Sequence, residues 1–263
     1  MYKLRNLVSQ YLSNFKKMKK YFFLLSILLT VSCQVTETIH LSSDGSGIIV
    51  VEHLRDEHSY MQIAKENYSN ENIYKDTTYI FGDYIKKHEE TFSRTAVADQ
   101  NVFLRYSDVK IHRKASSYDK EFRKTYTQNF QKASDIVDLS KTDHYLDDII
   151  NNYALSAEEH YYKVSYSYTN NRFNRTVTII DTLEQKKEFD KIEELKAKYK
   201  GYKLVQNYTL NYHFPRKIQS VSNALAKISD DRKSLSLQFL LTDYLQNPVS
   251  TNLEVVLEPE AVD

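Results

Sequence analysis

The sequence predicts an α+β fold, a mostly antiparallel sheet with packed helices, for residues 33–263. Several segments alternate apolar and polar side chains and are rich in β-branched and aromatic residues, which is typical of half-buried strands. Pairs of these segments flank turn signals such as Asp44-Gly45 and Asn170-Asn171, which indicates hairpins. The longest helix is expected at about residues 182–200, where capping signals mark both ends.

The first hairpin is predicted at residues 34–54. Residues 34–41 read as a strand through Val35, Ile39 and Leu41, with Glu37 or Thr38 between them. The run Ser42–Gly47 contains Asp-Gly, a preferred hairpin pair. Residues 47–54 are β-branched and apolar, so we expect them to form the returning strand.

The next segment is expected to hold two helices and then two strands. Residues 55–68 predict a helix with Tyr60, Met61 and Ala64 inward. Asp76-Thr77-Thr78 is a capping signal for a second helix over residues 79–90. Residues 91–98 and 102–114 are strand-like.

The middle of the chain combines a strand, a helix and a hairpin. Residues 121–130 fit either a helix or a strand, and we favour a strand because Thr and Tyr interrupt the helical pattern. Residues 135–153 have apolar side chains at helical spacing, broken near Ser140. Residues 161–168 and 173–181 alternate Tyr and Val around the two asparagines, as expected for a hairpin.

The last third begins with the long helix. Thr182 to Gln185 fit a capping box and Gly201 fits a helix stop. Its inward stripe is expected to be Phe189, Ile192, Leu195 and Tyr199. Strands are predicted over residues 203–214, 217–228, 234–241 and 252–257, the middle two as a hairpin. We expect the strands at both ends of the chain to share one sheet, with the long helix packed on it.

Charge and cysteine content limit the possible functions. Six of the 36 basic residues, but none of the 35 acidic ones, lie within residues 1–32, so the remainder of the chain is mildly acidic. A mildly acidic chain argues against a nucleic-acid partner, which usually binds a basic patch. Cys33 is the only cysteine, which excludes disulfides within the chain. Residues 33–263 are long enough for one large domain or two small, closely packed ones.

Residues 18–33, MKKYFFLLSILLTVSC, indicate an export signal. Lys19 and Lys20 precede a short apolar run that ends in small residues, which is typical of a secretory signal peptide. The run is too short for a bilayer core, which needs about 20 apolar residues. We interpret residues 18–32 as the signal peptide and residues 1–17 as a non-native extension before the initiator Met18.

The same segment resembles the signal of bacterial lipoproteins, because the apolar run ends at Ser32 and a lone Cys33. The resemblance implies that Cys33 is acylated, for example with palmitate, and becomes the mature N-terminus. Two or three acyl chains give firm attachment to a membrane. The residues before the cysteine match the lipoprotein pattern only in a relaxed form, which resembles the signals of Bacteroidetes-type lipoproteins. An ordinary cleaved signal or an uncleaved anchor is the alternative.

The first hairpin, with Asp44-Gly45-Ser46-Gly47 at its turn, resembles the start of LppM-type domains and of uncharacterised Bacteroidetes lipoproteins. That resemblance implies an α+β domain of the cell envelope. Surface-exported members carry acidic residues after the cysteine, whereas only Glu37 follows closely here. The resemblance therefore implies an outer-membrane lipoprotein that faces the periplasm.

No motif for catalysis or for a cofactor is found, so we expect no enzyme, no metal and no cofactor. His53, Asp56 and His58 are the nearest approach to a metal site, and their spacing fits an exposed helix start equally well. Acids also adjoin histidines at Asp143-His144 and at Glu158-Glu159-His160. These segments lack an apolar frame that could shift a pKa.

Three functions remain open. The first is a non-catalytic, membrane-anchored module that binds an envelope protein or assists assembly, using an exposed patch. The second is a periplasmic carrier or sensor of a lipid or other hydrophobic ligand, with Phe189, Ile192 and Tyr212 facing a cavity. The third, an envelope hydrolase, would need a cleft with clustered acids. We favour the first.

Overall fold

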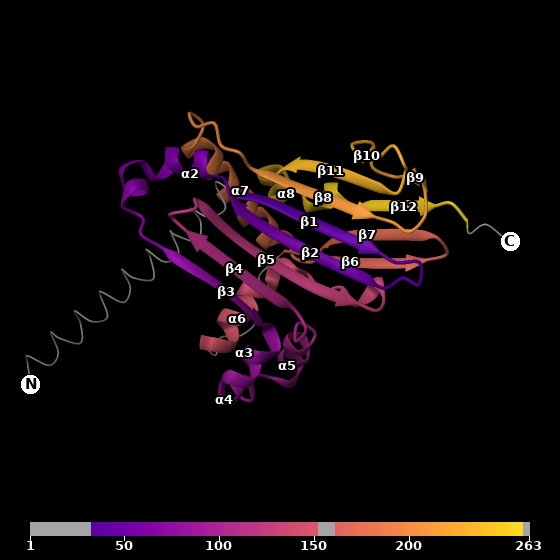
Figure 1. The fold of residues 1–263 in the computed structure, drawn as a ribbon, viewed down its shortest axis with the longest axis horizontal. Helices are drawn as coiled ribbons and strands as arrows, with labels where there is room; N and C mark the ends of the chain where they lie inside the picture. The colour runs from indigo at the N-terminus through magenta and orange to yellow at the C-terminus, as the bar shows by residue number, and fades with distance from the viewer. Residues whose placement is uncertain (1–32, 152–160, 260–263) are drawn as a thin grey trace, which may run out of the picture.

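Two β-sheets and a set of short helices make up the described part of the chain, residues 33–151 and 161–259 of this computed structural model (Figure 1). The eight-stranded sheet has the order β10 (Lys227–Ile228), β11 (Ser234–Leu240), β8 (Asn207–His213), β1 (Cys33–Leu41), β2 (Gly47–Arg55), β5 (Glu121–Phe130), β4 (Lys110–Ser116) and β3 (Tyr74–Ile80). Strands β1 and β8 are parallel, and the other neighbours in this sheet are antiparallel. The α+β fold class is confirmed.

The four-stranded sheet has the order β6 (Tyr162–Thr169), β7 (Arg172–Ile179), β12 (Leu253–Leu257) and β9 (Ile218–Val221). The α-helices are α2 (Glu57–Ala64), α3 (Phe81–Lys87), α4 (Glu89–Phe92), α5 (Val97–Leu104), α6 (Thr142–Asn151), α7 (Thr182–Lys198) and α8 (Leu241–Gln246). Short 3₁₀ helices are η1 (Lys65–Asn70), η2 (Ala133–Asp135), η3 (Leu139–Lys141) and η5 (Pro248–Thr251).

Both predicted turn signals form the hairpins expected of them. Gly45 has a φ of 84°, and Asp44 accepts hydrogen bonds from the backbone and the hydroxyl of Ser46 at 3.0 and 2.7 Å. Asn170 and Asn171 have φ values of 51° and 64°, the left-handed conformation that a two-residue hairpin turn requires. These turns set the registers of β1 with β2 and of β6 with β7.

Helix α7 is confirmed, but it begins and packs differently from the prediction. Asp181, not Thr182, caps it by accepting hydrogen bonds from the backbone of Leu183 and Glu184 at 2.8 and 2.9 Å. Of the expected apolar stripe only Ile192 is buried, whereas Phe189 is 45% exposed. The helix lies beside α8 rather than flat on a sheet, which leaves most of its surface in solvent.

Two stretches were predicted wrongly between residues 76 and 109. Asp76, Thr77 and Thr78 lie within strand β3 and cap no helix, although the helix predicted over residues 79–90 does form, as α3 and α4. Strand β3 lies at the sheet edge and has mostly exposed side chains, so it lacks the apolar alternation that identifies a strand. The predicted strand at residues 91–98 and the start of the one at residues 102–114 are instead largely helical, because α5 buries Phe103 in the core.

The two ends of the chain lie in different sheets, contrary to the prediction. Strand β1 is in the large sheet, whereas β12 pairs with β7 and β9 in the small one. Only the short β10 forms the predicted second hairpin with β11, because β9 leaves to join β12. Met61 was also expected to face inward, but it is 45% exposed, and Ser59 is the buried residue of α2.

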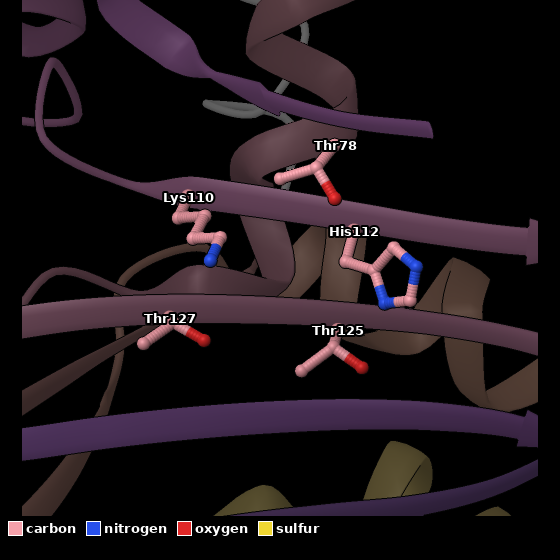
Figure 2. Close-up of a pocket in the computed structure, with 5 residues that line it drawn as sticks. All are labelled: Thr78, Lys110, His112, Thr125 and Thr127. Carbon is pink, nitrogen blue, oxygen red and sulfur yellow. The ribbon is translucent and has the colours of Figure 1, made fainter. Parts of the chain in front are cut away.

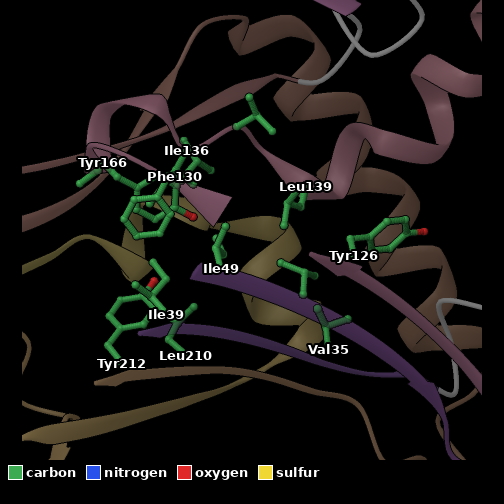
Figure 3. Close-up of a cluster of buried hydrophobic side chains, with 14 of the residues drawn as sticks. Val35, Ile39, Ile49, Tyr126, Phe130, Ile136, Leu139, Tyr166, Leu210 and Tyr212 are labelled. Atoms are coloured by element: carbon green, nitrogen blue, oxygen red, sulfur yellow. The ribbon is translucent and has the colours of Figure 1, made fainter. Parts of the chain in front are cut away.

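The core lies between the inner faces of the two sheets (Figure 3). Ile39, Ile49 and Leu210 contribute from the large sheet, each at most 1% exposed. Phe173 and Val255 are fully buried and contribute from the small sheet. One side of most strands therefore faces this shared core, whereas the edge strands β3 and β10 have no buried residue.

A charged pair lies inside this core. Glu37 on β1 and Arg175 on β7 are 5% and 1% exposed, and their charged groups are 3.4 Å apart. The carboxylate of Glu37 also accepts hydrogen bonds from the hydroxyls of Tyr166, Tyr208 and Tyr212 at 2.9, 3.0 and 2.5 Å. Carboxylate and hydroxyls thus satisfy one another where water is excluded.

The guanidinium of Arg175 is satisfied in the same way. It donates to the hydroxyls of Thr251 and Tyr208 at 2.6 and 3.0 Å. Burial opposes its charge, yet the surrounding tyrosines and Glu37 raise the pKa of Arg175 well above its usual value. Burial, together with the charge of Glu37, raises the pKa of Tyr212 well above its usual value. This set of polar side chains, here called the Glu37 cluster, joins the two sheets.

The Glu37 cluster makes a stability prediction. Replacing Glu37 with Ala leaves Arg175 charged and buried without its carboxylate, and losing one partner of such a pair costs about 3–5 kcal/mol. Glu52 is the matched control, because its partner Arg123 is half-exposed and such pairs contribute about 0–1 kcal/mol. Urea unfolding measures both variants. Equal losses for Glu37→Ala and Glu52→Ala would contradict a structural role for the cluster.

Candidate functional site

Cys33, the predicted lipidation site, is the first residue of β1, near the middle of the eight-stranded sheet. Its backbone pairs with Arg55, the last residue of β2. No linker separates Cys33 from the sheet, so a lipid on this residue would be joined directly to the folded domain. Lipidation itself stays a prediction.

A buried arginine fixes the structure beside Cys33. The guanidinium of Arg55 lies between the rings of Tyr60 and Phe122, 3.8 and 3.3 Å from their centroids. It donates to both carboxylate oxygens of Glu71 at 3.0 Å and to Glu57 at 2.6 Å. Burial opposes its charge, but the hydrogen bonds to the two glutamates raise the pKa of Arg55. Helix α2 and the segment after it are therefore held against the sheet end.

The outer face of the eight-stranded sheet, the side away from the core, is mainly polar. Its side chains are half-buried or exposed, unlike the alternate residues that enter the core. Strands β1, β8 and β11 present to it Thr36, Thr38, His40, Thr209, Asn211, His213, Ser234, Ser236 and Gln238. The rings of His40 and His213 stack with centroids 4.3 Å apart. Hydroxyls, amides and imidazoles thus form a broad array of hydrogen-bonding groups.

A shallow hollow of about 270 Å³ lies on this outer face. Thr78 on β3, Lys110 and His112 on β4, and Thr125 and Thr127 on β5 line it (Figure 2). Lys110 pairs in register with Thr127, and His112 with Thr125, which sets short side chains beside long ones. The hollow follows from that difference in side-chain length.

The hollow offers one cation and several hydroxyls. His112 is bonded to Asp76 at 2.8 Å, whereas Lys110 has no ion-pair partner among the described residues. An ammonium group beside three threonine hydroxyls suits a ligand with carboxylate, amide or hydroxyl oxygens. Sequence reasoning missed this surface, because its residues come from strands that are paired only in the fold.

The expected metal candidates do not converge. His53 is half-buried beside Tyr126, with ring centroids 5.6 Å apart, whereas His58 is exposed on α2. Asp56 caps α2 by accepting a hydrogen bond from the backbone of Ser59 at 2.8 Å. The described residues contain no group of three or more His, Cys, Asp or Glu that could hold a metal ion.

The prediction that the acids beside histidines lack an apolar frame is wrong for Asp143. Asp143 lies in α6, an amphipathic helix that does supply an apolar frame. It binds Arg113 and Lys124 at 2.5 and 2.7 Å, and these cations, against the effect of burial, lower the pKa of Asp143 to about 2. Glu158, Glu159 and His160 lie outside the described residues.

The three residues named for a ligand cavity do not line one together. Phe189 lies on the surface of α7, whereas Ile192 is buried. Tyr212 is fully buried, and its hydroxyl is bonded to Glu37. The three residues on which the prediction of a cavity for a hydrophobic ligand was based therefore do not support it.

His53 makes a pH-dependent stability prediction. Burial and then the charge of Lys124 lower the pKa of His53 to about 4, against the opposing charge of Asp143. Because the unfolded chain takes up this proton near pH 6.5, the stability from neutral His53 is complete above about pH 6.5 and falls by about 3 kcal/mol towards pH 4. In His53→Phe that part of the slope should disappear. Urea unfolding across this pH range measures it, and an unchanged slope would assign the pH dependence to other groups.

Comparisons with known proteins add little to this geometry. In the described part of the chain, no helix has both the length and the apolar character to cross a bilayer. No protein-family model matches the chain, and no curated protein matches it. The chain is loosely similar to the NMR structure of the folded domain of Mycobacterium tuberculosis LppM, with 9% identity over 88% of this chain and 94% of that one and a TM-score of 0.35. A likeness at this level supports no argument about function.

Proposed function

We propose that this chain is a membrane-anchored, non-catalytic binding module of the bacterial cell envelope. It engages another envelope protein through the outer face of its eight-stranded sheet. The observation that carries the proposal is the hollow of Lys110, His112 and three threonines on a broad polar face. Thr78 and Lys110 are exposed and Thr125 and Thr127 are half-buried, so a partner can reach these side chains.

The anchor is supported by the signal-like residues 18–32 and by the position of Cys33. A lipid on the first residue of a central strand would restrict the module to the membrane surface. The resemblance of the signal favours an outer-membrane lipoprotein facing the periplasm.

A binding role rather than catalysis is supported by where the titratable groups lie. Asp143 and His53, whose pKa values are displaced, are half-buried and engaged by an ion pair and by the ring of Tyr126, respectively. Active sites use displaced pKa values in clefts that a substrate can enter. The hollow offers the ammonium of Lys110, the imidazole of His112 and three hydroxyls, all of which can form hydrogen bonds with a partner.

The anchor is tested by growing the producing bacterium with an alkyne analogue of palmitate. The wild-type chain should incorporate the label at Cys33 and sediment with membranes, whereas Cys33→Ser should do neither. Peptide mass spectrometry then locates the label. An unlabelled N-terminal peptide that begins beyond residue 33 would overturn the anchor.

The binding face is tested by photo-cross-linking in intact cells. A photoreactive amino acid at Thr125 should yield a discrete adduct with one protein, because this position lines the hollow. Thr176, exposed on the outer side of β7, is the matched control. Lys110→Glu should reduce the adduct at Thr125, because it reverses the charge of the hollow. Equal adducts at both threonines, unaffected by Lys110→Glu, would overturn the proposal.

A further inference from the structure

The end of the large sheet that carries Cys33 also carries exposed aromatic and aliphatic side chains. Tyr74 and Tyr118 are 70% and 72% exposed, and Ile73 is 43% exposed. The hydroxyl of Tyr118 donates to the side chain of Asn72 at 2.7 Å, and the backbone of Ile73 is bonded to Ser117. Ile73, Tyr74 and Tyr118, here called the end patch, therefore adjoin one another at the turn between β4 and β5.

Strand register places the end patch at the level of Cys33. Cys33 is opposite Arg55, and the neighbouring Leu54 is opposite Arg123. Farther across the sheet, Glu121 is opposite Ser116, which is opposite Tyr74. The strands are about 4.8 Å apart, so β3 lies about 19 Å from β1 along the same end of the sheet.

The same register shows which residues extend past Cys33. Residues that lie side by side across the sheet at the level of Cys33 form one row. Arg55 is opposite Cys33, the ring of Phe122 on β5 contacts the guanidinium of Arg55, and Ala115 on β4 is opposite Phe122. Tyr74 lies one residue beyond this row, and Tyr118 lies beyond it in the turn. Each strand residue adds about 3.3 Å, so the end patch extends past Cys33 in the direction away from the sheet.

We propose that the end patch enters the lipid headgroup layer beside the acyl chains on Cys33. This rests on the proposed anchor, because the lipid sets the depth of Cys33. No linker lies between Cys33 and the paired strand. If the lipid holds Cys33 at the membrane surface, the rigid sheet therefore holds the end patch, which extends past Cys33, at the membrane as well. Tyrosine is enriched at this depth, since its ring is apolar and its hydroxyl remains hydrated.

The contact does not depend on a basic surface. Arg55 is paired with Glu57 and Glu71, and Lys114 with Glu121 at 2.5 Å, although the exposed Lys75 and Lys120 also lie beside the patch. Attraction to anionic lipids is screened by salt, whereas burial of aromatic rings is not. High salt should therefore leave the contact intact.

The chain contains no tryptophan, so one introduced tryptophan reports on a single position. Tyr118→Trp and Tyr74→Trp place the reporter in the end patch. Leu225→Trp is the control, because Leu225 is 63% exposed and lies far from the end patch. It precedes β10, which pairs with the half of β11 that is farther from Cys33. The lipidated full chain of each variant is reconstituted into vesicles with brominated acyl chains, and the vesicle-bound fraction is isolated by flotation.

The end-patch reporters should lose most of their fluorescence to the brominated lipid and shift to the blue, at low and high salt alike. The Leu225→Trp reporter should remain bright and unshifted. A chain that floats but shows equal quenching in all variants would overturn the membrane contact while leaving the anchor intact. A chain that does not float would overturn the anchor, and the contact with it.

Discussion

The ion pair between Glu37 and Arg175 determines how the two sheets face each other. Taking two charges out of water is unfavourable unless their geometry and further hydrogen bonds compensate. Here three tyrosine hydroxyls and Thr251 supply those bonds, from β6, β8 and η5. A displaced sheet would leave a buried charge unsatisfied, so the cluster favours one arrangement.

Much of the fold could be predicted because local signals decide it. Asp44-Gly45 and Asn170-Asn171 specify hairpins through their backbone conformations, and Asp181 marks the start of α7 one residue from the expected cap. The edge strand β3 could not be predicted, since its polar residues resemble a helix cap until β4 pairs with them. Neither could the separation of the terminal strands, which depends on pairing between distant segments.

The candidate site was only partly predictable for the same reason. Cys33 is marked by the residues before it, whereas the hollow needs β3, β4 and β5 side by side. The Glu37 cluster did leave a signal: Glu37 lies in phase with Val35 and Ile39, and Arg175 lies between Phe173 and Val177. A charge in phase with a buried face predicts a buried partner of opposite sign. The identity of that partner comes only from the structure.

The parallel pairing of β1 with β8 has a consequence for the order of events during biogenesis. Val35 pairs with Tyr208, so the central strand lacks its neighbour on one side until most of the chain is present. Contacts between residues so distant in sequence form slowly, because a long loop must close first. A nascent chain therefore cannot complete its large sheet until β8 has been synthesised.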